Sequence, residues 1–271
     1  MIGRTMQTAI AIAIGAALWT PGAASAQAAP PAVQAQPAGD LDLEPEALAA
    51  LENMGRTLRA LGSFGVESQA SLELVLDSGR KIELDTRIDY RVKQPNKLFA
   101  QLKGGRKDRE IYYDGRDFTV WAPTLKFYAT ATEVDKTLSQ LFVAAARDYG
   151  IELPLADLFF WGTEYAPVSS VTTAFKVGSM DLRGERVDQF AYSQGESDWQ
   201  LWLSQETSLP RKVVITSRAD PSMPEFTAFL DWNTEMRLDD GTFEFEPPQG
   251  ASAIVFAKLD AADEAAGEAT P

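Results

Sequence analysis

Residues 81–93 constrain the fold most strongly, because uncharged and charged side chains alternate along the whole stretch. One face would carry Ile82, Leu84, Thr86, Ile88, Tyr90 and Val92. The other face would carry Lys81, Glu83, Asp85, Arg87, Asp89, Arg91 and Lys93. This period of two predicts an antiparallel strand with one buried and one solvated face. At roughly 3.3 Å per residue the strand spans about 40 Å, a length typical of strands that curve around something.

The flanking segments predict further strands. Leu72, Leu74 and Leu76 alternate up to a turn at 77–79, which indicates a hairpin with the long strand. Other strands are expected at 97–103, 108–114, 117–122 and 125–130, and in succession between 171 and 247.

Apolar residues at steps of three and four predict two helices, over 45–61 and 134–149. Pro45 suits a first helical position, and Gly62 and Gly150 suit the two ends. A helix, a meander of strands, a helical insertion and a second meander together indicate an α+β domain.

The first 26 residues have the pattern of a secretory signal. Arg4 precedes a short apolar run, and the small residues Ala24, Ser25 and Ala26 follow it. We therefore expect a signal peptide over 1–26, cleaved near Ala26, and an exported protein. Ten apolar residues span about 15 Å as a helix, half of a bilayer core of roughly 30 Å, so we expect no stable membrane anchor.

Composition also separates the remaining chain into three parts. Residues 27–41 are expected to be a disordered linker rich in Pro, Ala and Gln, and residues 257–271 an acidic disordered tail. Residues 42–256 remain as a single domain. The net charge of −14 disfavours nucleic acid as a partner.

The sequence contains no cysteine and no histidine. It therefore lacks a Cys nucleophile, a Ser-His pair, and the ligands that zinc, copper and haem prefer. The stretches Asp77-Ser78-Gly79 and Asp239-Asp240-Gly241 resemble metal-binding loops in composition. Both fall between apolar runs, where Asp, Ser and Gly are the usual residues of a turn. We expect no enzyme, no catalytic residue, no metal and no cofactor. The domain must also be stabilised by packing without disulfides.

Two charged features leave alternatives open. Glu83 and Asp85 share one strand face and could do acid–base work, which leaves a carboxylate-based hydrolase as an alternative. They alternate with Lys81 and Arg87 on the solvated face of the strand, which favours ordinary surface charges. The basic stretch 106–109 follows two glycines, which indicates a hairpin tip; the other interpretation is a docking site for an acidic partner or a ligand head group.

Aromatic residues occur where both faces of a strand would be apolar, as in 111–113, 118–121 and 199–203. Either both faces are covered, or one lines an apolar cavity. The sequence leaves both possibilities open.

Four stretches resemble, in order, periplasmic lipoprotein carriers of the LolA type. Residues 90–98 resemble their cationic-Pro-x-basic-Leu stretch, and 111–123 look like the hairpin that follows. Residues 209–215 are similar to their late Leu-Pro strand, and 243–250 resemble the closing strand and Pro-x-Gly end. The matches span about 46–256. The chain resembles more closely still a family of predicted periplasmic proteins of unknown function with that fold.

The resemblance implies an α+β fold, in which a curved antiparallel half-barrel sheet holds helices in its concave face over an apolar cavity. It also implies a soluble periplasmic carrier for an acyl chain, a lipid or a lipidated protein. Similar proteins include an envelope-stress regulator, so a regulatory module with an envelope protein partner is the alternative. An arginine holds the lid in the carriers; Arg91 lies in the matching stretch, but its register puts it on the solvated face.

The side chains expected to line the cavity are apolar and come from the strands, the second helix and the segment after it. They are Ile88, Tyr90, Leu98, Tyr113, Phe118, Val120, Phe127, Leu138, Leu141, Phe142, Phe159, Phe160 and Trp202.

Overall fold

The computed structural model describes residues 43–76, 78–104, 108–134 and 136–256. The expected signal peptide, the linker over 27–41 and the acidic tail over 257–271 lie outside the described residues. No helix within the described ranges has the length and apolar character to cross a membrane.

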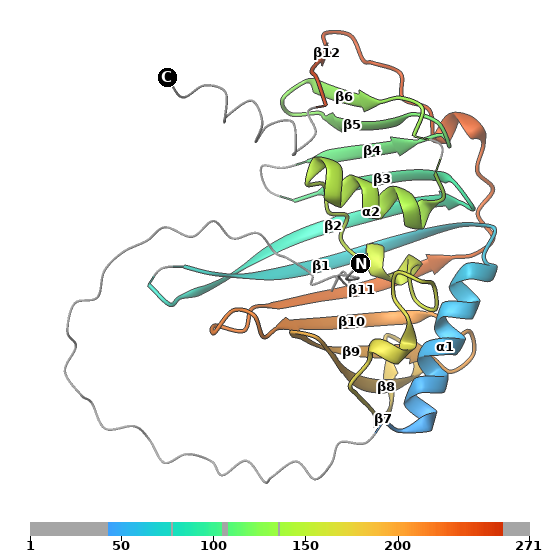
Figure 1. Ribbon diagram of the computed structural model, residues 1–271, viewed down its shortest axis with the longest axis vertical. Coiled ribbons are helices and arrows are strands. Elements are labelled where there is room, and N and C mark those ends of the chain that lie inside the picture. The colour runs from blue at the N-terminus through green and yellow to red at the C-terminus, as the bar shows by residue number, and fades with distance from the viewer. Residues whose placement is uncertain (1–42, 77, 105–107, 135, 257–271) are drawn as a thin grey trace, which may run out of the picture.

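The described strands form one open sheet of twelve, in the order β12-β6-β5-β4-β3-β2-β1-β11-β10-β9-β8-β7 (Figure 1). The first half contains β1 (Ser63–Val75), β2 (Lys81–Lys93), β3 (Lys97–Lys103), β4 (Arg109–Tyr113), β5 (Phe118–Ala122) and β6 (Phe127–Ala131). The second half contains β7 (Thr173–Leu182), β8 (Glu185–Gln194), β9 (Ser197–Ser204), β10 (Pro210–Ser217) and β11 (Glu225–Asn233). Strand β12 (Ser252–Ala253) pairs with β6 in parallel; the other neighbouring strands are antiparallel.

Two α-helices, α1 (Pro45–Ala60) and α2 (Leu138–Tyr149), lie on the same face of the sheet (Figure 1). We call this face the inner face and the opposite one the outer face. Three short 3₁₀ turns complete the fold: η1 (Ala156–Phe159), η2 (Val168–Ser170) and η3 (Asp240–Thr242). The expected α+β class, an unclosed antiparallel sheet with helices on one face, is confirmed.

Helix α2 begins four residues later than its hydrophobic period predicts. Thr137 caps the helix: its side chain accepts a hydrogen bond from the Gln140 amide, and Gln140 Oε1 accepts one from the Thr137 amide. Val134 extends the apolar period but lies before this cap. Its amide donates a hydrogen bond to the Arg116 carbonyl. The predicted end is confirmed, because Gly150 has the left-handed conformation that closes a helix, with a φ of 62°.

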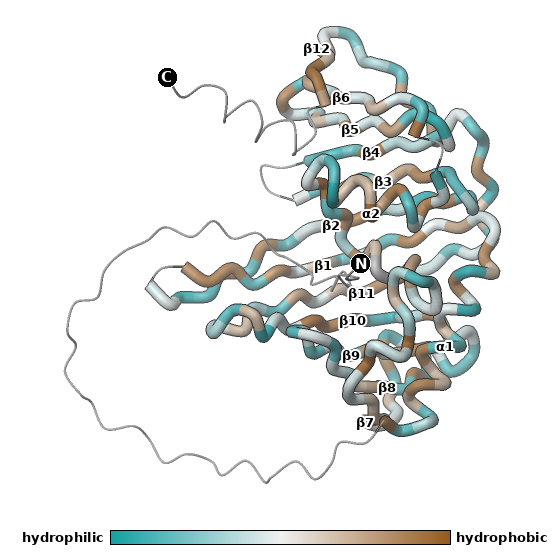
Figure 2. The backbone as a smooth tube through the Cα atoms, in the orientation of Figure 1, coloured by the Kyte–Doolittle hydropathy of each residue, from teal (hydrophilic) through white to brown (hydrophobic). Residues whose placement is uncertain are grey.

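Strand β2 has the predicted bounds, but only half of its apolar face is buried. Ile88, Tyr90 and Val92 are buried in the core, whereas Ile82 and Leu84 are 41% and 46% exposed. The pairing of β1 with β11 stops at Leu72, and the pairing of β2 with β3 stops at Arg87. The end of the β1–β2 hairpin therefore projects from the sheet as a two-stranded ribbon with an apolar face (Figure 2).

One large apolar core lies between the inner face and the helical segments. Three buried tyrosines tie those segments to separate strands. The Tyr90 hydroxyl donates to the Pro154 carbonyl at 2.5 Å, and the Tyr113 hydroxyl donates to the Lys136 carbonyl at 2.6 Å. Tyr192 reaches α1 in the same way. These bonds position the loop after α2, the start of α2, and α1 over the sheet.

Candidate functional site

The space where we expected a cavity holds packed aromatic rings. The Phe159 ring lies 6.1 Å from Phe64, 6.2 Å from Tyr90 and 5.4 Å from Phe142, measured between ring centroids. The Phe160 ring lies 6.0 Å from Phe142. Side chains of the segment after α2 thus fill much of the gap between that helix and the central strands.

Most of the predicted cavity residues belong to the buried core: Ile88, Tyr90, Leu98, Tyr113, Phe118, Leu138, Leu141, Phe142 and Phe160. Val120 and Phe159 are partly buried and pack against it. The fold brings these residues together on the inner face. Their role in binding a ligand remains a prediction.

The structure does not bring the other two predicted residues to this group. Phe127, on β6 near the edge of the sheet, is 44% exposed. Trp202 lies on the outer face of β9, in a small cluster with Val187 and Val214. The ammonium of Lys212 covers its ring at 4.5 Å, which explains how an aromatic residue stays buried on that face.

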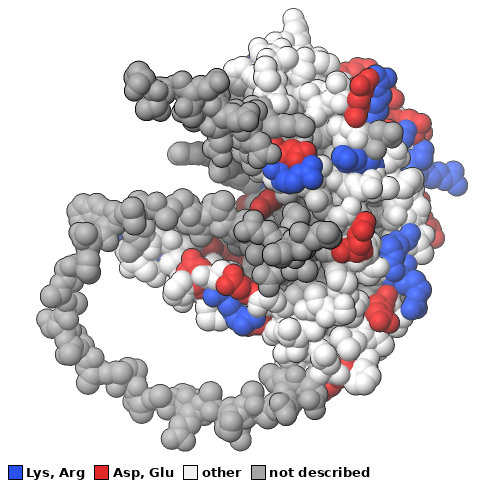
Figure 3. Space-filling model, viewed as in Figure 1, with Lys and Arg blue, Asp and Glu red and all other residues white. Residues whose placement is uncertain are grey.

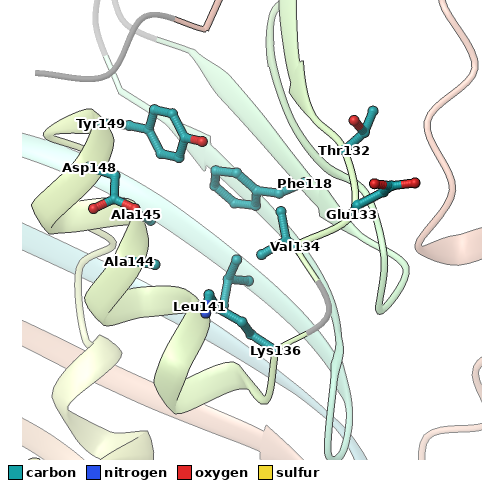
Figure 4. A pocket seen from close by; sticks show the side chains of 10 residues that line it. All are labelled: Phe118, Thr132, Glu133, Val134, Lys136, Leu141, Ala144, Ala145, Asp148 and Tyr149. Atoms are coloured by element: carbon teal, nitrogen blue, oxygen red, sulfur yellow. The ribbon is translucent and has the colours of Figure 1, made fainter. Parts of the chain in front are cut away.

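A hollow of about 260 Å³ remains between α2, β5 and the segment that joins β6 to α2. Its lining is shown in Figure 4: Phe118, Thr132, Glu133, Val134, Lys136, Leu141, Ala144, Ala145, Asp148 and Tyr149. Phe118 and Leu141 were predicted as cavity residues. Val134, Ala145 and Tyr149 were missed as lining residues, although the helical period places them on one face with Leu141.

The sequence creates this hollow by placing small side chains opposite large ones. Ala144 and Ala145 face the sheet in the middle of α2, and alanine fills little of the space that a larger residue would occupy. Phe118 follows a tight turn, in which the Asp114 carboxylate accepts hydrogen bonds from the amides of Arg116 and Asp117 at 2.8 Å each. The turn fixes the point where β5 begins, and so the position of the Phe118 ring.

The hollow has an apolar interior and a charged rim. Glu133 and Asp148 each pair with an arginine: Arg116 Nη2 lies 3.6 Å from Glu133 Oε1, and Arg147 Nε lies 2.5 Å from Asp148 Oδ1. Lys136 is also at the rim. Such a site can hold an apolar group and leave a polar end near water. On the face seen in Figure 3, charges of both signs are scattered in small groups.

The carboxylates that could have supported hydrolysis lie away from this hollow. Glu83 is opposite Glu73 on the outer side of the projecting ribbon, and Glu83 and Asp85 are exposed. A hydrogen bond from Lys81 lowers the pKa of Glu73. In the basic stretch 106–109, the first two residues lie outside the described ranges. Among described residues, no three His, Cys, Asp or Glu side chains group as metal ligands.

A second hollow, of about 270 Å³, lies on the outer face and is lined by Arg87, Asp89, Gln101 and Lys103. Arg91 is on the same face, as its register predicts, with its guanidinium 5.4 Å from the centre of the Phe99 ring. Its four lining side chains are charged or polar and lie on the paired strands β2 and β3. Its lining offers no apolar enclosure for a lipid chain.

Comparison with known proteins identifies a family. The model of a family described as "Predicted periplasmic protein (DUF2092)" matches residues 47–257. No curated protein matches this chain.

Several solved structures are similar to this chain at low sequence identity. Lipoprotein LppX of Mycobacterium tuberculosis is 13% identical, with a TM-score of 0.45 over 72% of this chain and 100% of its own. A chain of the Pseudomonas aeruginosa MucA/MucB complex is 16% identical, with a TM-score of 0.41 over 74% of this chain and 61% of its own. A LolA superfamily protein of Nitrosomonas europaea is 13% identical, with a TM-score of 0.35 over 73% of this chain and 97% of its own.

Proposed function

The chain belongs to the family of predicted periplasmic proteins described as DUF2092, and from this premise we propose that it binds an apolar chain of a lipid or an acylated protein in the hollow beneath α2. The observation that supports the proposal is the lining of that hollow. Phe118, Val134, Leu141 and Tyr149 surround two helix alanines, while the charged side chains lie at the rim.

The size of the hollow limits how much of such a ligand it can take. Its 260 Å³ lies just below the roughly 300–1,000 Å³ that small-molecule sites offer. With roughly 30 Å³ for each methylene, about the volume of a water molecule, it admits about eight carbons. At about 0.8 kcal/mol per buried methylene, the gross gain is about 6 kcal/mol before ordering costs are subtracted.

A gain of that size supports only weak binding, because a Kd of 1 μM requires about 8 kcal/mol. Tighter binding of a longer chain requires more room. Two side chains that could provide it are Phe142, next to the lining residue Leu141 on α2, and Phe159, whose ring lies 5.4 Å from that of Phe142. We therefore expect short acyl chains to bind without rearrangement and long ones to displace these rings.

Replacing each of two alanines of α2 with leucine, one at a time, tests the proposal. Ala144 lines the hollow, whereas Ala146 is exposed on the same helix. Protein purified from the periplasm should carry lipid, detected by mass spectrometry, and should bind cis-parinaric acid in solution. Ala144→Leu should weaken that binding about tenfold or more by filling the hollow, and Ala146→Leu should leave it unchanged. Wild-type protein that carries no lipid and ignores the fatty acid would contradict the proposal.

A second candidate function is interaction with an envelope protein, and the projecting ribbon favours it. Ile82 and Leu84 are exposed on the same side of the ribbon, and within the described part of the chain no third strand pairs with 73–76 or 78–86. Exposed apolar surface beside open strand edges suits an extended apolar segment of a partner. A photo-crosslinker at Leu84 should then give one discrete product in periplasmic extract, and the same group at Asp85, on the other side, should not.

A further inference from the structure

The C-terminal strap, residues 234–256, wraps around one edge of the sheet. It starts at the end of β11 and first crosses the outer face, where Met236 packs over Gly65. Asp240 then holds it to the turn between β2 and β3, with its Oδ1 atom 2.8 Å from Lys93 Nζ and 3.0 Å from Lys97 Nζ. Figure 1 shows the strap continuing to the β6 edge.

Phe245 anchors the strap on the outer face. Its ring lies 5.3 Å from Tyr112, 5.9 Å from Trp121 and 5.1 Å from Tyr128, between centroids. These three rings come from β4, β5 and β6. Contacts with three aromatic side chains attach this part of the strap to three neighbouring strands.

The strap then pairs with the edge strand and turns onto the inner face. The Ser252 amide donates to the Lys126 carbonyl at 2.9 Å, and the Ile254 amide donates to the Tyr128 carbonyl at 2.8 Å. This covers backbone groups that an edge strand would otherwise expose. Strand β12 has only two residues, and Ile254 and Val255 after it are 52% and 89% exposed.

Phe256 ends the described strap on the inner face, beside the hollow. Its ring lies 6.0 Å from Phe118 and 4.3 Å from Tyr149, between centroids. Phe118 and Tyr149 both line the hollow, one from the sheet and one from the last residue of α2 (Figure 4). The Phe256 ring therefore contacts both walls of the hollow, β5 through Phe118 and α2 through Tyr149.

We propose that residues 254–256 are a latch, in which Phe256 keeps α2 closed against β5 until an apolar chain enters the hollow. The inference rests on the proposed function and concerns control of the same site. This end of the strap is weakly attached, because β12 has only two residues and the residues after it are exposed. The rest of the strap is attached through Phe245 and Asp240. Segments with few buried contacts open at the lowest free energy, so the inner end opens first while the outer anchor stays in place.

A reversible lock tests the latch. Phe127 and Ser252 are register partners on β6 and β12, and neither lines the hollow. Neighbouring strands lie about 4.8 Å apart, within the distance that a disulfide bridges. The chain has no cysteine, so the double variant Phe127→Cys, Ser252→Cys would hold the only disulfide. The oxidised protein should bind cis-parinaric acid about tenfold more weakly than the same protein after reduction.

Opening the latch should have the opposite effect. Phe256→Ala should strengthen binding of the same fatty acid about three- to tenfold, because the aromatic contact no longer opposes entry. The matched control, Phe245→Ala, removes an aromatic anchor of the strap on the outer face and should change binding less than about twofold. Without ligand, Phe256→Ala should also speed hydrogen exchange at the Ser252 and Ile254 amides and in the last turn of α2.

These measurements separate failure of the latch from failure of the proposed function. Equal binding by the oxidised, reduced and Phe256→Ala proteins would overturn the latch and leave the proposed function standing. Unchanged hydrogen exchange in Phe256→Ala would overturn it as well. If no form binds the fatty acid but exchange rises at the end of α2, the latch is supported and the proposed ligand is wrong.

Discussion

The hydroxyl of Tyr192 on β8 donates a hydrogen bond to the carbonyl oxygen of Ala47 on α1, at 3.0 Å. Both residues are buried, and 145 positions separate them in the chain. Burial raises the pKa of Tyr192, so the hydroxyl keeps its proton and remains a donor across the physiological range. The bond fixes the first helix of the domain to a strand of the second meander.

Replacing Tyr192 with Phe should lower the free energy of unfolding by about 0.5–1.5 kcal/mol, the usual net value of a hydrogen bond. Urea denaturation followed by tryptophan fluorescence measures it, since the Trp199 ring stacks 4.2 Å from Tyr192. Tyr128→Phe is the control, because no described residue hydrogen-bonds to that hydroxyl. Equal losses in the two variants would show that the bond to α1 contributes nothing.

The attachment of the strap at Asp240 should depend on pH. Hydrogen bonds from Lys93 and Lys97 lower the pKa of Asp240 below its ordinary value of 3.8. The attachment is therefore complete above about pH 4 and is lost as the pH falls through the lowered pKa. At pH 7 Asp240→Asn should be cleaved faster by added protease within the strap than wild type. The difference should disappear in acid, and a difference independent of pH would contradict the ion pair.

Periodicity predicted the strands well where one face is buried and the other solvated. The bounds of β2 match because charged and uncharged residues alternate along its whole length, although only half of its apolar face is buried, and β3 also has the predicted bounds. In 199–203, by contrast, apolar residues point to both faces, and the pattern does not tell which face the helices cover. Trp202 points to the outer face because its neighbours Leu201 and Leu203 belong to the main core, and Lys212, its partner on β10, covers its ring.

The hollow and the strap were beyond sequence reasoning for related physical reasons. The hollow exists because Ala144 and Ala145 leave space unfilled, and the period of a helix shows which side is apolar but not how completely it packs. In the strap, Phe243 and Phe245 alternate with Glu244 and Glu246, which predicted a closing strand there. That prediction is wrong, because residues 234–251 form no strand. The strap's anchors Phe245 and Phe256 lie on opposite faces of the sheet because the chain turns around the β6 edge, and only the tertiary structure shows that turn.

The docking of α1 depends on a glycine. A Cβ atom at Gly55 would lie 2.6 Å from the Trp161 carbonyl oxygen, which also accepts a hydrogen bond from Arg59. Gly55→Ala should therefore destabilise the protein by about 1–3 kcal/mol, despite the better helix propensity of alanine. At Gly62 a Cβ would meet nothing within 4 Å, so Gly62→Ala is the matched control and should be neutral or stabilising in thermal denaturation. A stable Gly55→Ala protein would mean that α1 is not held against the segment at 161.

The paired carboxylates of the ribbon provide a test between binding and hydrolysis. Glu83 and Asp85 are exposed on the outer side of the ribbon, and neither lines the hollow under α2. The double variant Glu83→Ala, Asp85→Ala should therefore bind cis-parinaric acid within about twofold of wild type, because solvated charges far from an apolar site contribute little to binding there. Ala144→Leu should lose binding in the same assay. If wild type hydrolyses acyl esters and the double variant does not, the carboxylates act on a substrate, and the hollow is not the functional site.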